Sequence, residues 1–95
     1  MKKSFVVSLV KNGLLGGGLV VDDDGITYRT NKMTVPREYR NLVMRSEDIA
    51  EVTEGRLLFL PTVTIAMEDG KEYKFLVFFN SKGLLEAVTS MGIGG

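Results

Sequence analysis

The stretch TVTIAMEDGKEYKFLVFF, residues 62–79, decides the fold class of this chain. Apolar residues occupy alternate positions on both sides of an Asp69-Gly70 pair: Val63, Ile65 and Met67 before it, and Tyr73, Phe75 and Val77 after it. A period of two is typical of a strand with one buried face, and Asp-Gly between two such runs is typical of a β-hairpin. The stretch therefore predicts two antiparallel strands joined by a tight turn.

The N-terminal third predicts further strands and a second hairpin. Residues 5–10 and 19–21 are rich in Val, Leu and Phe, and residues 26–30 alternate apolar with polar side chains. Asp24-Gly25 separates the last two runs and predicts a type I′ turn, in which both central residues need positive φ. The glycine-rich segment 13–18 predicts a flexible loop and a bulged start to the strand that follows.

The middle of the chain has shorter signals. Residues 31–40 predict a loop around Pro36, and residues 42–44 predict a strand. Residues 46–49 predict a short turn, after which strand rhythm continues until Gly55. The apolar stretch 57–60 is stopped by Pro61.

The last segment changes to the period of a helix. Asn80 or Ser81 is placed to cap it, and Gly92 is placed just after its end. One apolar stripe must face the sheet, formed by Leu84, Leu85, Val88 and Met91. The chain is therefore expected to be mainly β (α+β), with about seven short antiparallel strands in a bent sheet or partial barrel and one C-terminal α-helix.

Composition limits the domain count and the chemistry. The 95 residues allow one domain, 1–95, with its core at about 5–91. The chain has no Cys and no His, which removes the usual nucleophiles, imidazole bases and zinc ligands. Twelve basic and twelve acidic residues cancel, unlike in a nucleic-acid binder. We therefore expect no enzyme, no cofactor, no metal site and no nucleic-acid partner. The first apolar run is interpreted as a strand and not a signal peptide, so a cytoplasmic location is expected.

The order of these elements resembles the GRAM and pleckstrin-homology (PH)-like superfamily, as in bacterial GRAM-type domains. The segments that carry the resemblance are 17–21 (GGLVV), 42–52 (LVMRSEDIAEV), 63–65 (VTI), 69–77 (DGKEYKFLV) and the helix at 84–91. Residues 22–40 depart from the family's usual "Leu-Thr-x-x-Arg-Leu-x-Phe" pattern. The resemblance implies a PH-like partial barrel of about seven antiparallel strands capped by one C-terminal α-helix.

Three motifs invite a specific chemistry and do not meet its requirements. Segment 13–18 has neither the Gly-Lys-Ser/Thr of a P-loop nor a following helix. Counting from Asp22, position twelve of an EF-hand loop is Met33, where a bidentate Glu is needed. The aromatic residues lie among acidic residues and not in a basic groove, so they predict a core and not a base-stacking platform.

Several PH-like domains bind phosphoinositide head groups, but the expected loop, residues 11–16, holds one cation. A broader cationic stretch is a candidate contact for anionic lipid: Arg29, Lys32, Arg37, Arg40 and Arg45. A candidate apolar patch for a partner consists of Leu14, Leu15, Leu58, Leu76 and Phe79. The leading hypothesis is a non-catalytic interaction module that binds a protein or a second copy of itself. The alternatives are a peripheral membrane module and, third, a small-ligand carrier or enzyme.

Overall fold

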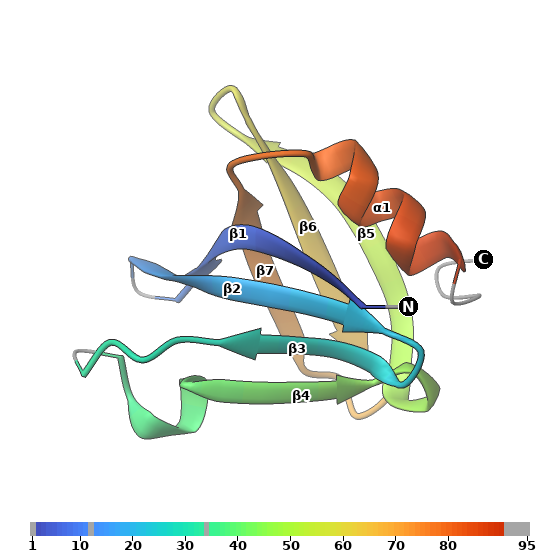
Figure 1. The fold of residues 1–95 in the computed structure, drawn as a ribbon, viewed down its shortest axis with the longest axis horizontal. Helices are drawn as coiled ribbons and strands as arrows, with labels where there is room; N and C mark the ends of the chain where they lie inside the picture. Colours follow the sequence, from blue (N-terminus) through green and yellow to red (C-terminus); the bar gives the residue numbers. More distant parts are fainter. Residues whose placement is uncertain (1, 12, 34, 91–95) are drawn as a thin grey trace.

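Seven antiparallel strands form one curled sheet in the computed structural model, which describes residues 2–11, 13–33 and 35–90 (Figure 1). The strands are β1 (Lys3–Val10), β2 (Leu14–Asp22), β3 (Gly25–Arg29), β4 (Asn41–Arg45), β5 (Ile49–Leu57), β6 (Leu60–Met67) and β7 (Glu72–Val77). They are hydrogen-bonded in the order β4-β3-β2-β1-β7-β6-β5. The sheet curls into a half-barrel, and the helix α1 (Ser81–Ser90) packs on it. The expected fold class is confirmed.

The glycine run lies inside β2, which corrects the expectation of a flexible loop. β1 and β2 pair without interruption from Lys3↔Val21 to Val10↔Leu14. Gly17 stands opposite Val7, and a Cβ there would clash with the Arg29 carbonyl and come within 2.9 Å of the Tyr28 ring. Glycine at this position therefore lets a neighbouring backbone and an aromatic ring approach the strand closely.

The first Asp-Gly hairpin forms with a different turn from the one expected. Asp22 pairs with Gly25, so Asp23 and Asp24 are the central residues, and neither has positive φ. The Asp22 carboxylate holds the turn by accepting the N–H groups of Asp24 (2.9 Å) and Gly25 (3.1 Å). Gly25, with φ 153°, then opens β3 where a Cβ would clash with the Met44 carbonyl. The side-chain cap replaces the type I′ geometry.

The apolar stretch at 57–60 is a hairpin turn, which the sequence did not indicate. β5 runs on past Gly55 to Leu57, and only Leu58 and Phe59 separate it from β6. Pro61 does not stop a strand, because it lies within β6. The pairing of β6 with β7 begins one residue later, at Thr62. Its missing N–H therefore costs no bond to β7.

The core fills the inside of the curl and joins the two halves of the sheet. Tyr28 from β3 and Phe75 from β7 are fully buried, with ring centroids 5.5 Å apart. From α1, Leu84, Ala87 and Val88 are buried against the strands, as the predicted apolar stripe required. Asn80 Oδ1 accepts the Gly83 N–H at 3.1 Å, so Asn80 is the cap. The predicted positions Met91 and Gly92 lie outside the described residues.

Candidate anion-binding groove

A groove of about 930 Å³ lies on the face of the sheet that does not carry the core. It runs across β1, β2 and β3 and is bounded by the chain that follows β3 and by the residue that follows β7. Its lining residues are Val6, Val7, Ser8, Gly16, Gly17, Gly18, Arg29, Thr30, Asn31, Lys32, Arg40, Asn41 and Phe78.

Two glycines make the floor of the groove. Because side chains alternate along a strand, Gly16 and Gly18 face the groove while Gly17 faces the core. A Cβ at Gly18 would have only the Phe5 carbonyl oxygen within 4 Å, at 3.8 Å, so this position is open. The hollow therefore exists because β2 has no side chains at two successive outward positions.

Three cations border this floor. The Lys32 Nζ lies 3.0 Å from the point that a Cβ on Gly16 would occupy. Arg29 donates its Nε to Asn41 Oδ1 at 3.2 Å, which leaves its terminal guanidinium nitrogens for other acceptors. Arg40 instead donates to the carbonyls of Val35 (2.8 Å) and Met33 (2.9 Å) and so holds the β3–β4 connection in place. Arg29 and Lys32 are thus the free donors of the site.

A serine hydroxyl completes the polar part of the groove. Ser8 lines the groove from β1, and its Oγ lies 3.7 Å from the Cβ point of Gly16. A hydroxyl at this place can donate a hydrogen bond to a ligand in the groove.

The lining also fixes the chemistry that the groove accepts. No Asp or Glu side chain occurs among the described residues that line it, whereas Val6 and Phe78 form one apolar wall. Ammonium, guanidinium and hydroxyl donors around a carboxylate-free hollow favour an oxyanion such as a phosphate. The wall suits an apolar group attached to that anion.

The five predicted lipid contacts are therefore divided. Arg29, Lys32 and Arg40 meet in the groove. Arg37 is exposed on the short 3-10 helix η1 (Arg37–Tyr39) and does not line it. Arg45 lies at the far end of β4, where it forms an exposed ion pair with Glu47 at 3.5 Å.

The predicted apolar patch is divided as well. Leu58, Phe79 and Leu14 are exposed as expected. Leu76 is only 1% exposed, so it contributes nothing to an apolar surface and that part of the expectation is wrong. Leu15 is partly buried and keeps part of its side chain at the surface.

Several residues of the groove were not found from the sequence. Ser8 and Val6 come from β1, Phe78 follows β7, and none of the three belongs to a motif. The signal that was present is Gly16-x-Gly18 in a strand, because alternate glycines leave one face of the strand bare.

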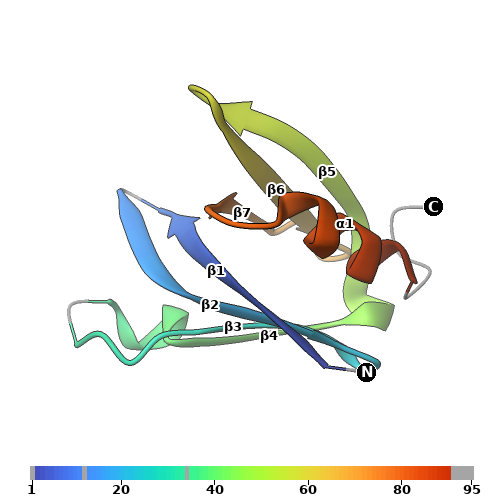
Figure 2. The same cartoon turned by 45° about the horizontal axis from the view of Figure 1, so that its top comes forward.

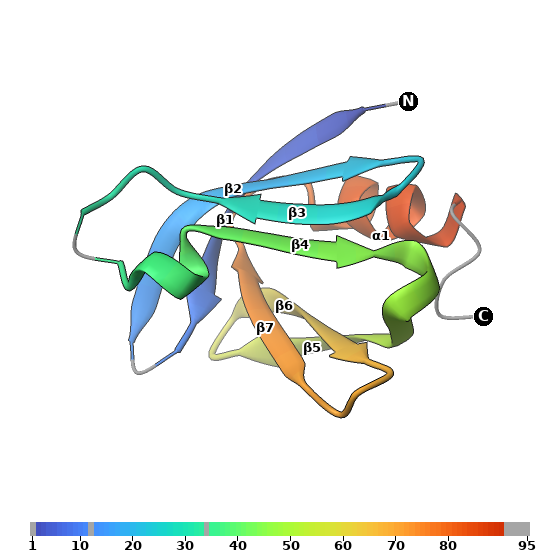
Figure 3. The same ribbon diagram turned by 90° about the horizontal axis from the view of Figure 1, so that it is seen from below.

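Charge is divided along the long axis of the molecule. The basic end comprises the β1–β2 turn and the β3–β4 connection and carries Lys11, Arg29, Lys32, Arg37 and Arg40, with Glu38 as its carboxylate. The opposite, acidic end comprises three turns linked by backbone bonds from Ser46 N–H to the Asp24 carbonyl and from Glu68 N–H to the Asp48 carbonyl. It carries Asp22, Asp23, Asp24, Glu47, Asp48, Glu68 and Asp69, beside Arg45 and Lys71. Figures 1 and 3 place the first set of loops at the left and the second at the right.

Other classes of site were also sought in the described part of the chain. No group of three acidic side chains there is arranged to hold a metal ion. None of its helices has the length and apolar character of a membrane span.

Comparison with known proteins gives the fold alone. No protein-family model matches the sequence, and no curated protein matches it. Among solved structures, the chain is similar to the C-terminal domain of an unknown protein from Leishmania infantum, with a TM-score of 0.77 and 12% sequence identity. The match covers 94% of this chain and 80% of that one. The half-barrel with a terminal helix is thus an architecture that a very different sequence also adopts.

Proposed function

We propose that this chain is a non-catalytic module that attaches to anionic lipid surfaces and that its groove takes the phosphate of a head group. The observation that carries the proposal is the carboxylate-free groove, with Arg29 and Lys32 free to donate and the Ser8 hydroxyl in its lining. A phosphate would be bound by charge-assisted hydrogen bonds, which are shorter and stronger than neutral ones.

The resemblance noted in the sequence supports the same function. A GRAM or PH-like domain is expected to have seven antiparallel strands followed by a helix, and this is the order of elements here. Several PH-like domains bind lipid head groups. The groove lies beside the β1–β2 turn and the β3–β4 connection, which carry Lys11, Lys32, Arg37 and Arg40 against one carboxylate, Glu38.

Vesicle co-sedimentation tests the proposal. The protein is expected to pellet with phosphatidylcholine vesicles that contain phosphatidylserine or phosphoinositide, less at physiological salt, and not with phosphatidylcholine alone. The double variant Arg29→Gln/Lys32→Gln should bind about thirtyfold more weakly, at roughly 1 kcal/mol per cation. Arg45→Gln/Lys71→Gln removes the same charge from the acidic end and should change binding little. Equal losses in the two variants, or no pelleting of the unchanged protein, would refute the proposal.

A variant with unchanged charge distinguishes binding in the groove from general attraction of anionic lipid to surface cations. Gly18→Val places a side chain on the open floor, where a Cβ meets no close neighbour, and Val favours a strand. The variant should fold with unchanged or higher stability and lose its preference for one head group over another. Retained selectivity would show that the groove is not the site.

A second candidate function, self-association, rests on a separate observation. β5 is a nine-residue edge strand that pairs only with β6, so half of its backbone groups are open to a second strand. Sedimentation equilibrium over a wide concentration range tests it, and a monomer throughout would exclude it.

A further inference from the structure

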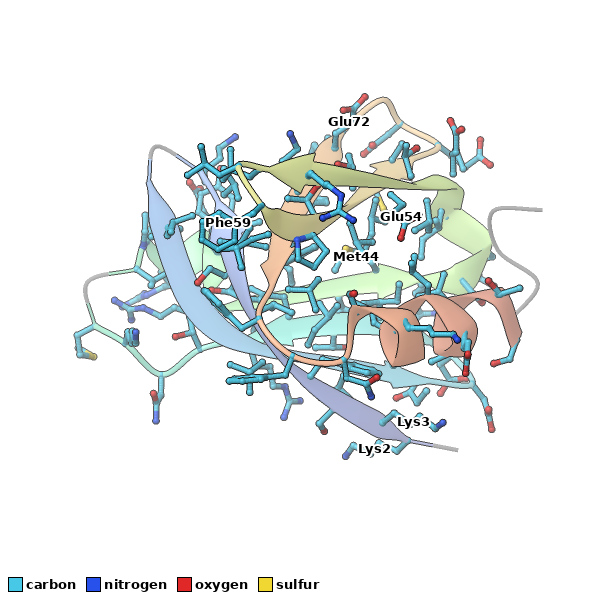
Figure 4. The ribbon with its side chains drawn as sticks, turned by 90° about the horizontal axis from the view of Figure 1, so that it is seen from above. Lys2, Lys3, Met44, Glu54, Phe59 and Glu72 are labelled. Atoms are coloured by element: carbon cyan, nitrogen blue, oxygen red, sulfur yellow. The ribbon has the colours of Figure 1, made fainter. Side chains whose placement is uncertain are left out.

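Three loops each present exposed apolar side chains: the β1–β2 turn and the β3–β4 connection, at the left of Figures 1 and 2, and the β5–β6 hairpin, at the top. Leu14 lies at the β1–β2 turn and Met33 in the β3–β4 connection. Leu58 and Phe59, the tip of the β5–β6 hairpin, are 86% and 78% exposed. In Figure 4, Phe59 lies on the same side of the view as the β1–β2 turn, while Lys2 and Lys3 lie on the other. One side of the molecule, from the β5–β6 hairpin to the β3–β4 connection, therefore carries exposed apolar side chains on separate loops.

The tip is poorly explained by the stability of the fold. Leu58 has φ 59°, a left-handed conformation in which Gly or Asn is favoured and a large L-residue is strained. Its side chain is almost fully exposed, so it returns little packing energy for that strain. A glycine would make the same turn more easily, so the fold gives no reason for a leucine here, and its side chain is open to a partner outside the chain.

The charges around these loops indicate the kind of partner. The β1–β2 turn and the β5–β6 hairpin lie in segments without Asp or Glu, 1–21 and 55–67, and the β3–β4 connection has one acidic residue, Glu38, against Lys32, Arg37 and Arg40. Each loop is also close in sequence to a cation: Lys11, Arg56 and Lys32 respectively. Apolar side chains beside an excess of cations match the interface of an anionic bilayer, where the chain meets both hydrocarbon and phosphate.

We propose that the Leu58–Phe59 tip inserts into the interface of an anionic bilayer, with Leu14 and Met33 as shallower contacts. The side that carries the three loops would then face the membrane, with the acidic end in water. This inference rests on the proposed attachment to lipid, but it names a different element from the groove.

A single tryptophan reports the insertion directly, because the chain has none. In Phe59→Trp, vesicles containing phosphatidylserine should shift the emission to the blue, and brominated acyl chains should quench it. Val43→Trp is the matched control, since Val43 is 61% exposed on β4 and belongs to none of the three loops. Its emission should stay that of water-exposed indole.

Partition measurements complete the test. Leu58→Ser/Phe59→Ser should weaken binding at least about tenfold, because each buried Leu or Phe side chain is worth about one power of ten or more. Val43→Ser should leave binding unchanged. Leu58→Gly should weaken binding while its unfolding midpoint stays the same or rises, a combination that a structural role for Leu58 does not produce.

The outcomes separate this inference from the proposed function. Salt-sensitive pelleting with a tryptophan at position 59 that stays in water would overturn the insertion and leave head-group binding in place. No pelleting at all would overturn both. A blue shift without vesicles that grows with protein concentration would assign the tip to a contact between two copies and would also overturn the insertion.

Discussion

Tyr28 combines a polar atom with complete burial. Its hydroxyl donates to the Leu15 carbonyl, and its ring packs against Phe75 and beside Gly17. Burial raises the pKa of Tyr28 above its ordinary value of 10.0, because the phenolate would lose its hydration. The neutral phenol is thus part of the folded state.

A pH effect on stability follows from that pKa. The contribution of the neutral phenol is complete below the unfolded-state pKa of about 10 and is lost as the pH rises from there through the higher folded-state pKa. Unfolding midpoints in guanidinium should therefore fall as the pH rises above about 10. Tyr28→Phe should cost about 1 kcal/mol at neutral pH through the lost hydrogen bond and should show a smaller alkaline fall. An equal alkaline fall in Tyr28→Phe would contradict the assignment, and Tyr73→Phe, at a half-buried position, serves as control.

The glycines show what a sequence hides at the scale of single residues. Strands are recognised by alternating apolar side chains, and a run of three glycines has none to alternate. Gly17 is required by the Tyr28 ring, whereas Gly16 and Gly18 leave a groove. These opposite roles depend on neighbours from other strands, so composition alone could only predict a loop.

At the scale of elements, the start of α1 depends on an unusual cap. Asn80 has φ 58° and accepts the Gly83 N–H, and a Cβ on Gly83 would clash with the Asn80 side chain. Asparagine suits this place because it tolerates left-handed backbone and also supplies the oxygen. The cap had been predicted from the residue type; the backbone conformation had not.

Two substitutions separate these contributions. Asn80→Ala loses the acceptor and puts a Cβ in left-handed backbone, so it should lower the free energy of unfolding by about 2 kcal/mol. Asn80→Gly loses the acceptor but relaxes the backbone, so it should cost only about a few tenths of a kcal/mol. Urea unfolding measures both. Equal losses would mean that the backbone conformation of Asn80 is not strained.

The hairpins mark where pattern succeeds and fails among the elements. β6 and β7 were predicted because their buried face alternates and Asp69-Gly70 supplies turn chemistry, with Gly70 at φ 93°. The β5–β6 hairpin was missed because Leu58 and Phe59 have no turn chemistry and extend an apolar run. A turn made by residues unsuited to turning is where function can override local preference.

At the scale of the whole molecule, the division of charge has a chromatographic consequence. The chain has a formal net charge of zero at pH 7, yet its two ends have opposite sign. It should be retained on both a cation exchanger and an anion exchanger at low salt and leave both near about 0.1 M salt, where the Debye length is about 10 Å. Arg29→Gln/Lys32→Gln should reduce retention on the cation exchanger only. If the unchanged protein passed through both resins, its two ends would not bind the resins independently, and the prediction would be wrong.

The site was predicted in part, for reasons that belong to this scale. The five cations were predicted as one stretch, but β4 carries Arg45 about 13 Å from Asn41, at roughly 3.3 Å per residue. A stretch continuous in sequence is therefore divided between the two ends. The groove itself needs Ser8 from β1, Gly18 from β2 and Phe78 just after β7, and their meeting depends on the β1–β7 pairing.

The separated charges also act before any contact is made. A uniform electric field neither attracts nor repels a molecule with no net charge, but it rotates a molecule whose charges are separated into a dipole. Near a charged surface the field decays within about 8 Å at physiological salt, much less than the 34 Å length of the molecule. Only the end nearer the surface then interacts with the field. An anionic surface attracts a molecule that arrives with its basic end first and repels one that arrives with its acidic end first. Encounters with an anionic surface would thus be selected by orientation, and the loops at the basic end would arrive first.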